Sequence, residues 1–192
     1  KLAEIGDCHT LTDSEMKTFL LKSFKKLVTD LAPEFSSNYQ NDAHEFLITV
    51  LSQIQSFAPQ LQKTASYLGT NYTCPVKKYM LFRMESTRTC KMCGDQSLRQ
   101  EKFTNLSLDL VPGESIEEML ERYLMEVELE FACECGGKTS GQKFAFATLP
   151  QFLIIHLKRF RFTSSFNLEK VNDPVRLQRE LVVSSKLSFR EH

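Results

Sequence analysis

Four of the six cysteines stand in two closely spaced pairs, a pattern typical of structural metal sites with thiolate ligands. Cys90 and Cys93 form a C-x-x-C motif that Gly94 follows, and Cys133 and Cys135 form a C-x-C motif. A short turn can present both of its sulfurs to one ion, and glycine permits the positive φ with which such a turn closes. The two pairs therefore predict a tetrahedral Zn²⁺ site with four sulfur ligands.

The spacing of these cysteines departs from that of compact zinc sites in two respects. About 40 residues separate the pairs, against the roughly 15–20 usual in such sites, so the intervening chain must fold outward and return. The second pair is also one residue short of C-x-x-C, which leaves a metal-free site and a three-ligand site as alternatives. A redox-active pair is less favoured, because Cys90 does not lie on the strand-to-helix turn that activates such thiols.

A second group of polar residues, Gln40, Asp42 and Glu45, lies at the start of a predicted helix. Apolar side chains recur at helical intervals from Ala43 to Ile54, and Asn41 or Asp42 is the expected N-cap. Acidic residues there complement the helix dipole, so the residue pattern alone indicates helix initiation and no chemistry.

Adjacent Cys8 and His9 are the remaining combination that could suggest a nucleophile with its base. Such pairs are made in space and seldom between neighbours along the chain. We therefore assign them no catalytic role.

The elements that must position these residues alternate between helices and strands. A capping box of Thr12 and Glu15 predicts a helix that ends before Pro33, and a second box, Ser115 with Glu118, opens a short helix. A polar loop is expected after the second long helix, and strands are expected on both sides of each cysteine turn. The predicted loop spans 60–75, and the predicted strands span 77–89, 96–110 and 126–131.

The stretch from Leu149 to Phe162 predicts the central strand. Pro150 makes the chain arrive extended, and the unbroken apolar run 152–155 is typical of a strand buried on both faces. From His156 onward, basic and aromatic residues alternate, which indicates a strand end at the surface.

Composition restricts the class of protein. The 192 residues suit one domain or most of one, with 42% hydrophobic and 25% charged residues. A net charge of zero argues against bulk attraction to nucleic acid or to an anionic membrane, and no apolar run approaches the ~20 residues that cross a bilayer. Paired cysteines without a secretory signal sequence predict a cytoplasmic or nuclear protein.

Taken in order along the chain, these motifs resemble those of ubiquitin-specific proteases. The resemblance rests on Gln40-Asn-Asp-Ala-His-Glu-Phe-Leu47, on the two cysteine pairs, and on Leu149-Pro-Gln-Phe-Leu-Ile-Ile-His-Leu-Lys-Arg-Phe160. It reaches from the first long helix to about Val183, although Asn41 stands where many members have a second glutamine.

This resemblance implies an α+β fold, the hand of a papain-like cysteine protease. It would comprise partial thumb helices (1–73), zinc-ribbon-like fingers (74–148) and a truncated, antiparallel palm sheet (149–192). The fingers would hold the body of ubiquitin, while Asp42 engages an arginine in the ubiquitin tail and Gln40 and Glu45 line the same region. The implied partners are ubiquitin and ubiquitinated proteins, with no nucleic acid and no membrane.

The resemblance assigns no catalytic residue to this chain. The nucleophilic cysteine of the family lies in an Asn-x-Cys-Tyr-x-Asn box before the first helix, and its base lies in a histidine box after the palm strand. Cys8 lacks those surroundings, and His156 belongs to the palm motif. We therefore expect this chain to be an excerpt of a deubiquitinase. The excerpt would bind the substrate and be inactive by itself.

Two other functions remain open. One is a catalytically inactive module that only binds ubiquitin. The other is a zinc-ribbon protein that binds nucleic acid through Lys158, Arg159 and Arg161, with Phe160 and Phe162 as a stacking surface. The zero net charge counts against the latter.

Overall fold

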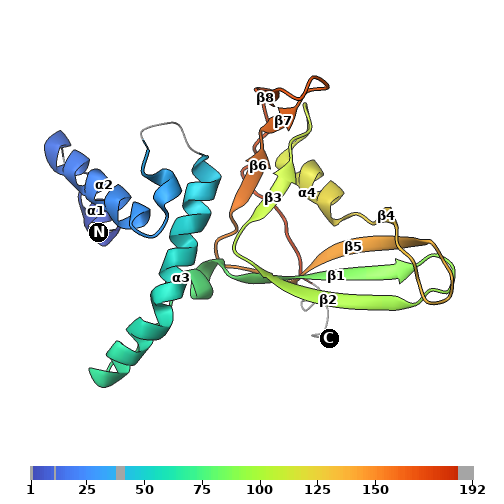
Figure 1. Cartoon of the computed structure of the whole chain (residues 1–192), viewed down its shortest axis with the longest axis horizontal. Coiled ribbons are helices and arrows are strands. Elements are labelled where there is room, and N and C mark those ends of the chain that lie inside the picture. Colours follow the sequence, from blue (N-terminus) through green and yellow to red (C-terminus); the bar gives the residue numbers. More distant parts are fainter. Residues whose placement is uncertain (1, 11, 38–41, 186–192) are drawn as a thin grey trace. The chain divides into compact units, whose positions relative to one another are not determined.

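The computed structural model describes residues 2–10, 12–37 and 42–185. By internal contacts the chain divides into two units, Lys1–Val76 and Lys77–His192. The first unit is helical, and the second contains the strands and one short α-helix (Figure 1).

Three α-helices and one 3₁₀ turn form the first unit: α1 (Leu2–Asp7), α2 (Ser14–Thr29), η1 (Pro33–Phe35) and α3 (Ala43–Tyr67). The Phe46 ring meets the rings of Phe24 and Phe35 edge-on, with centroids 6.3 and 5.3 Å away, so an aromatic cluster joins α2, η1 and α3. The N-cap of α2 is Asp13 rather than Thr12, whose predicted capping box is therefore wrong.

Helix α3 is longer than the sequence analysis predicted. It runs through Pro59 to Tyr67, whereas a loop was expected from Gln60. The residues that follow Pro59, Gln-Leu-Gln-Lys, are good helix formers. The helix therefore continues for two more turns beyond the proline, which removes one backbone N–H from its hydrogen-bond pattern.

The second unit is built on a four-stranded antiparallel sheet with the strand order β2-β1-β5-β4. After one π-helical turn, η2 (Val76–Met80), the strands are β1 (Phe82–Cys90), β2 (Gln96–Phe103), β4 (Val127–Glu130) and β5 (Thr139–Thr148). The first cysteine turn connects β1 to β2, and the second connects β4 to β5. Strands are thus present on both sides of each cysteine turn, although the one predicted over 77–89 begins only at Phe82, because 77–80 belong to the π-helical turn.

Four short strands make two further pairs. The strands β3 (Leu106–Asp109) and β6 (Ile155–Lys158) pair in parallel, and β7 (Phe160–Phe162) pairs with β8 (Leu168–Lys170). The single strand predicted over 96–110 is in fact β2 and β3, which belong to different sheets.

The predicted central strand differs from the structure in three ways. The stretch 149–162 is divided into β6 and β7, and Phe152 is 60% exposed rather than buried on both faces. The strand that carries the palm motif also pairs with β3 in parallel, although an antiparallel palm was expected.

The core of the second unit lies where the long sheet, β3 and the helix α4 (Ile116–Leu124) meet. Its buried side chains come from alternate positions of the strands and from one face of α4: Phe82, Met84, Leu106, Leu108, Met119, Leu120 and Phe146. The capping box of Ser115 and Glu118 that starts α4 is present as predicted. This core anchors one end of the long sheet, and the cysteine turns lie at the other.

Candidate functional site

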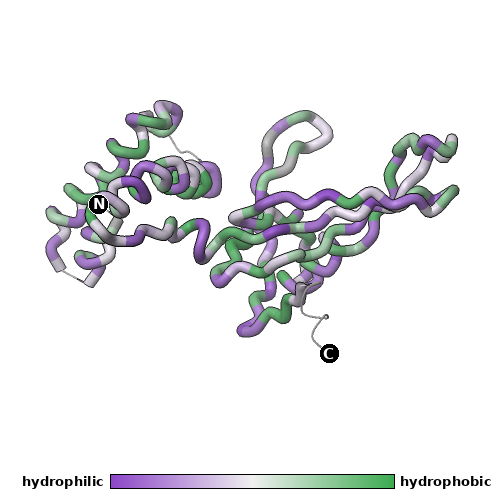
Figure 2. The backbone as a smooth tube through the Cα atoms, turned by 90° about the horizontal axis from the view of Figure 1, so that it is seen from below, coloured by the Kyte–Doolittle hydropathy of each residue, from purple (hydrophilic) through white to green (hydrophobic). Residues whose placement is uncertain are grey.

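Antiparallel pairing of β1 with β5 brings the two cysteine turns together. Cys90 is the last residue of β1 and lies opposite Ser140 at the start of β5, next to the second turn. The Cys90 and Cys135 sulfurs are 3.7 Å apart, and those of Cys93 and Cys133 are 3.8 Å apart. All four sulfurs lie within 4.8 Å of one another, and both views show the turns at the same end of the sheet (Figures 1 and 2).

These distances fit a tetrahedral site for one metal ion. A Zn–S bond of about 2.3 Å gives a tetrahedron with an edge of about 3.8 Å. The two short sulfur–sulfur distances match that edge, and the other pairs need only small side-chain rotations. The four predicted ligands are therefore brought together, C-x-C turn included, and could hold a metal ion.

The ionisation of the four thiols is strongly unequal. Backbone N–H groups of Cys93 and Met92 point at the Cys90 sulfur and lower the pKa of its thiol to about 6. Backbone N–H groups also favour the thiolates of the other three cysteines, but the neighbouring sulfurs together with desolvation outweigh them, and the pKa of each thiol is raised. Four thiolates at this separation repel one another, and a divalent cation removes that repulsion.

Contacts between the two hairpins brace the cluster. The backbone N–H of Lys91 donates to the carbonyl oxygen of Thr139 at 3.1 Å, and the Lys91 ammonium pairs with the Glu126 carboxylate. Nearby, the Arg88 guanidinium stacks 3.5 Å from the centroid of the Phe131 ring. The sequence analysis did not identify these contacts, because the residues involved are far apart along the chain.

Of the predicted substrate-binding residues, Asp42 and Glu45 lie at the start of α3, and Gln40 lies outside the described residues. The Asp42 carboxylate accepts hydrogen bonds from the N–H groups of His44 (2.7 Å) and Glu45 (3.0 Å). Both acidic residues are exposed. The predicted N-cap is confirmed, and Asp42 is held rigidly at the surface.

The histidines considered in the sequence analysis, His9 and His156, lie in different surroundings. Within the described residues, the side chains of Cys8 and His9 form no hydrogen bond with each other. His156 Nδ1 lies 3.1 Å from the Ser107 hydroxyl on the neighbouring strand, so it links β6 to β3. The expectation that this chain contributes no catalytic residue stays a prediction.

The basic residues considered for nucleic-acid binding are partly engaged in contacts within the chain. Lys158 pairs with Asp109 at 2.9 Å, and Arg159 donates to the backbone carbonyls of Val171 and Asp173 at 3.3 and 3.1 Å. Phe160 and Phe162 remain exposed. Two of the three basic residues are thus engaged within the chain, and the expectation that the protein binds no nucleic acid stays a prediction.

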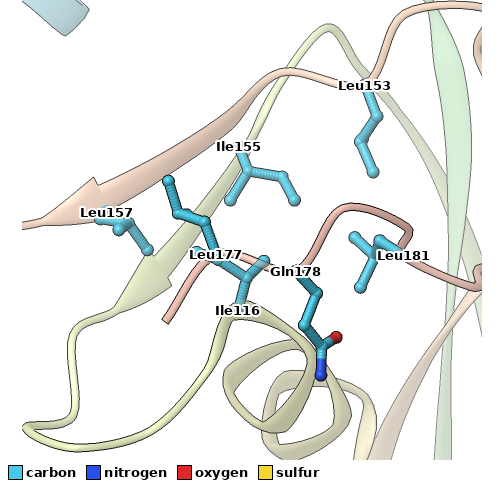
Figure 3. Close-up of a pocket in the computed structure, with 7 residues that line it drawn as sticks. All are labelled: Ile116, Leu153, Ile155, Leu157, Leu177, Gln178 and Leu181. Atoms are coloured by element: carbon cyan, nitrogen blue, oxygen red, sulfur yellow. The ribbon is translucent and has the colours of Figure 1, made fainter. Parts of the chain in front are cut away.

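A hollow of about 310 Å³ lies beside β6 and α4 and is almost entirely apolar (Figure 3). Six aliphatic side chains and one amide line it: Ile116, Leu153, Ile155, Leu157, Leu177, Leu181 and Gln178. It contains no group that could transfer a proton or bind a metal. Among the described residues, no helix combines the length and apolar character needed to cross a bilayer.

Comparison with known proteins gives concordant matches. The family model "Ubiquitin carboxyl-terminal hydrolase" matches residues 6–191. Ubiquitin carboxyl-terminal hydrolase 37 of Bos taurus is 36% identical over 91% of this chain, and hydrolase 29 of Mus musculus is 33% identical over 96%. The chain spans about a fifth of the length of these relatives (20% and 23%).

Solved structures show the same fold. A structure titled as the SAGA Ubp8/Sgf11/Sus1/Sgf73 module bound to ubiquitin aldehyde matches with a TM-score of 0.68 and 21% identity, over 88% of this chain and 38% of that chain. A second SAGA module, which contains a variant of Ubp8, matches with a TM-score of 0.58 and 27% identity, over 72% of this chain and 33% of the other. The α+β fold inferred from the resemblance is confirmed. Since the family model covers nearly every residue, this chain belongs to the ubiquitin carboxyl-terminal hydrolase family.

Proposed function

We propose that the longer protein containing this chain is a deubiquitinating thiol protease. It would hydrolyse the isopeptide or peptide bond after the C-terminal residue of ubiquitin, and this chain would hold the ubiquitin. The observation that carries the proposal is the family match over residues 6–191. The nucleophile and the base would come from other parts of the protein.

The long sheet of the second unit offers a surface for the globular body of ubiquitin. Strand β2 is an edge strand whose side chains from Gln96 to Lys102 are all exposed, so none of them is needed for the core. An extended, solvated sheet surface of this kind suits a large polar partner better than a small-molecule ligand.

Asp42 is the proposed partner of an arginine in the ubiquitin tail, and Glu45 and Gln40 would line the same region. Two backbone hydrogen bonds fix the Asp42 carboxylate, so little side-chain entropy is lost when a guanidinium binds. The carboxylate would then serve both as a helix cap and as a substrate contact.

The metal is proposed to be a structural Zn²⁺ held by Cys90, Cys93, Cys133 and Cys135. Two sulfur–sulfur distances that match a tetrahedron, and a cluster that in the described part of the chain consists of sulfur atoms alone, support this assignment. Bound zinc would fasten the tips of the two hairpins to each other and take no part in proton transfer. We also propose a cytoplasmic or nuclear location, which the six free cysteines support.

The test of this function is hydrolysis of ubiquitin whose C-terminal carboxyl carries a fluorophore in amide linkage. We expect the longer protein to release the fluorophore, and ubiquitin that lacks its tail should not compete for the site. Tight binding without hydrolysis would overturn the enzymatic proposal in favour of an inactive ubiquitin-binding module. Absence of binding would overturn both. Metal analysis should give one zinc per chain, and Cys133→Ser should lose it.

A further inference from the structure

The two cysteine turns close with the same pair of backbone hydrogen bonds, although the second turn is one residue shorter. In the first turn, Gly94 N–H donates to the Cys90 carbonyl at 3.0 Å, and Cys90 N–H donates to the Asp95 carbonyl at 2.9 Å. In the second turn, the equivalent bonds run from Gly136 to Cys133 (2.9 Å) and from Cys133 to Gly137 (2.8 Å). Gly94 thus corresponds to Gly136, and Asp95 corresponds to Gly137.

Gly94 and Gly136 are both glycines for the same conformational reason. The φ angle of Gly94 is +76° and that of Gly136 is +88°, and a Cβ at either residue would meet no atom within 4 Å. Both positions need glycine for its backbone freedom and not for space.

The second corresponding pair differs. The first turn has a side chain there, that of Asp95, whereas Gly137 is buried and its φ is not positive. A Cβ on Gly137 would lie 3.0 Å from the Cys90 sulfur, 3.3 Å from the Cys135 sulfur and 3.0 Å from the Met92 Cβ. Non-bonded heavy atoms pack at about 3.5–4.0 Å, so all three distances are too short.

We propose that Gly137 is a positioning residue of the metal site, and that its missing side chain compensates for the shortened C-x-C turn. Removing one residue from the turn moves position 137 against two of the four ligand sulfurs. Only a residue without a Cβ then lets the Cys90 and Cys135 sulfurs approach to 3.7 Å. Its N–H also points at the Cys135 sulfur, at 3.4 Å.

The proposed effect is specific to the metal-bound state. In the metal-free protein the Cys90 and Cys135 side chains can rotate away from a new methyl group at a small cost, and the exposed turn at Met92 can shift by the few tenths of an ångström that its own Cβ contact requires. Metal–sulfur bonds of about 2.3 Å remove that freedom. The inference rests on the proposed metal site, and its test must separate failure of the site from failure of the glycine's role.

The experiment compares Gly137→Ala with Asp95→Ala in the full chain, because both variants place a methyl group at corresponding positions. Co²⁺ replaces Zn²⁺ as a spectroscopic probe, and a chromophoric chelator competes for Zn²⁺ to give the affinity. We expect Gly137→Ala to weaken binding by about 10- to 100-fold, the range for residues that orient metal ligands, and to alter the thiolate–Co²⁺ absorption. Asp95→Ala should bind as the wild type does, and all three metal-free proteins should melt at the same temperature.

Each of the other possible results refutes a particular part of the proposal. A wild-type chain that binds neither Co²⁺ nor Zn²⁺ refutes the metal site and the role of Gly137 with it. Equal affinity and equal spectra of the wild type and Gly137→Ala refute the role of Gly137 while the metal site stands. A metal-free Gly137→Ala protein that already melts lower than the wild type shows a general folding requirement instead.

Discussion

Asp42 is predicted to serve two purposes that substitution can separate. Its carboxylate caps α3 through the N–H groups of His44 and Glu45, and it is the proposed partner of an arginine in the ubiquitin tail. Asp42→Ala removes both the cap and the charge. Asp42→Asn keeps a side-chain oxygen that caps about as well as aspartate and removes only the charge.

The magnitudes follow from these contacts. Loss of an N-cap costs about 1 kcal/mol of unfolding free energy, so Asp42→Ala should be destabilised by that amount and Asp42→Asn should not. A hydrogen bond to a charged group contributes about 1.5–3 kcal/mol, which corresponds to a loss of roughly 10- to 150-fold in kcat/KM for both variants.

The assay measures kcat/KM of the longer protein with fluorophore-linked ubiquitin, and chemical denaturation measures stability. A second ubiquitin with its tail arginines changed to alanine completes a double-mutant cycle. Asp13 provides the matched control, because its carboxylate caps α2 in the same way, at 3.0 Å from the N–H groups of both Glu15 and Met16. Asp13→Ala should lose stability and keep its kcat/KM.

One result would refute the reasoning. If Asp42→Asn hydrolyses wild-type ubiquitin as fast as the unmodified enzyme does, Asp42 is only a helix cap. Equal losses for Asp42→Asn with both ubiquitins would likewise show that the carboxylate acts on some group other than the tail arginines.

Three further predictions concern the second unit. Phe146→Ala empties a fully buried site and should cost about 3–5 kcal/mol in urea unfolding, whereas Phe162→Ala at an exposed site should change stability by less than about 0.5 kcal/mol. The Ser115 N–H holds the pKa of the Glu118 carboxyl below its usual value in the folded protein. The contact therefore contributes its full stabilisation above the unfolded-state pKa of about 4.3. This stabilisation disappears as the pH falls through the lower pKa of the folded state. Acid unfolding should show a smaller pH dependence in Glu118→Gln, and an unchanged profile would contradict this. Because the pKa of Cys90 is about 6, zinc binding at pH 7 should release about three protons and weaken steeply as the pH is lowered. Calorimetry in two buffers counts these protons, and a release of four would show that the Cys90 thiol is not ionised beforehand.

Features that depend on neighbouring residues could be predicted from the sequence. The cap at Asp42, the capping box of Ser115 and Glu118, and the strands on both sides of the cysteine turns were predicted and are present. Each depends on side chains within about four positions of one another, so the sequence pattern contains the information that decides it.

Features that depend on competition between distant parts of the chain could not be predicted in the same way. Phe152 is exposed although its apolar neighbours suggested a strand buried on both faces. Burial of a strand depends on which elements cover it, and that is a property of the tertiary fold.

The proposed metal site shows both kinds of information. The sequence by itself determined which four sulfurs are suited to bind zinc and which family the chain resembles. Only the tertiary structure decided that the C-x-C turn and the C-x-x-C turn lie close enough to share one ion. The register of β1 against β5 places Cys90 opposite Ser140 and so brings the two turns side by side. A slip of one residue in that register would turn the Cys90 side chain to the other face of the sheet. Likewise, position 137 requires a residue without a Cβ only because the fold brings two sulfurs from different hairpins against it.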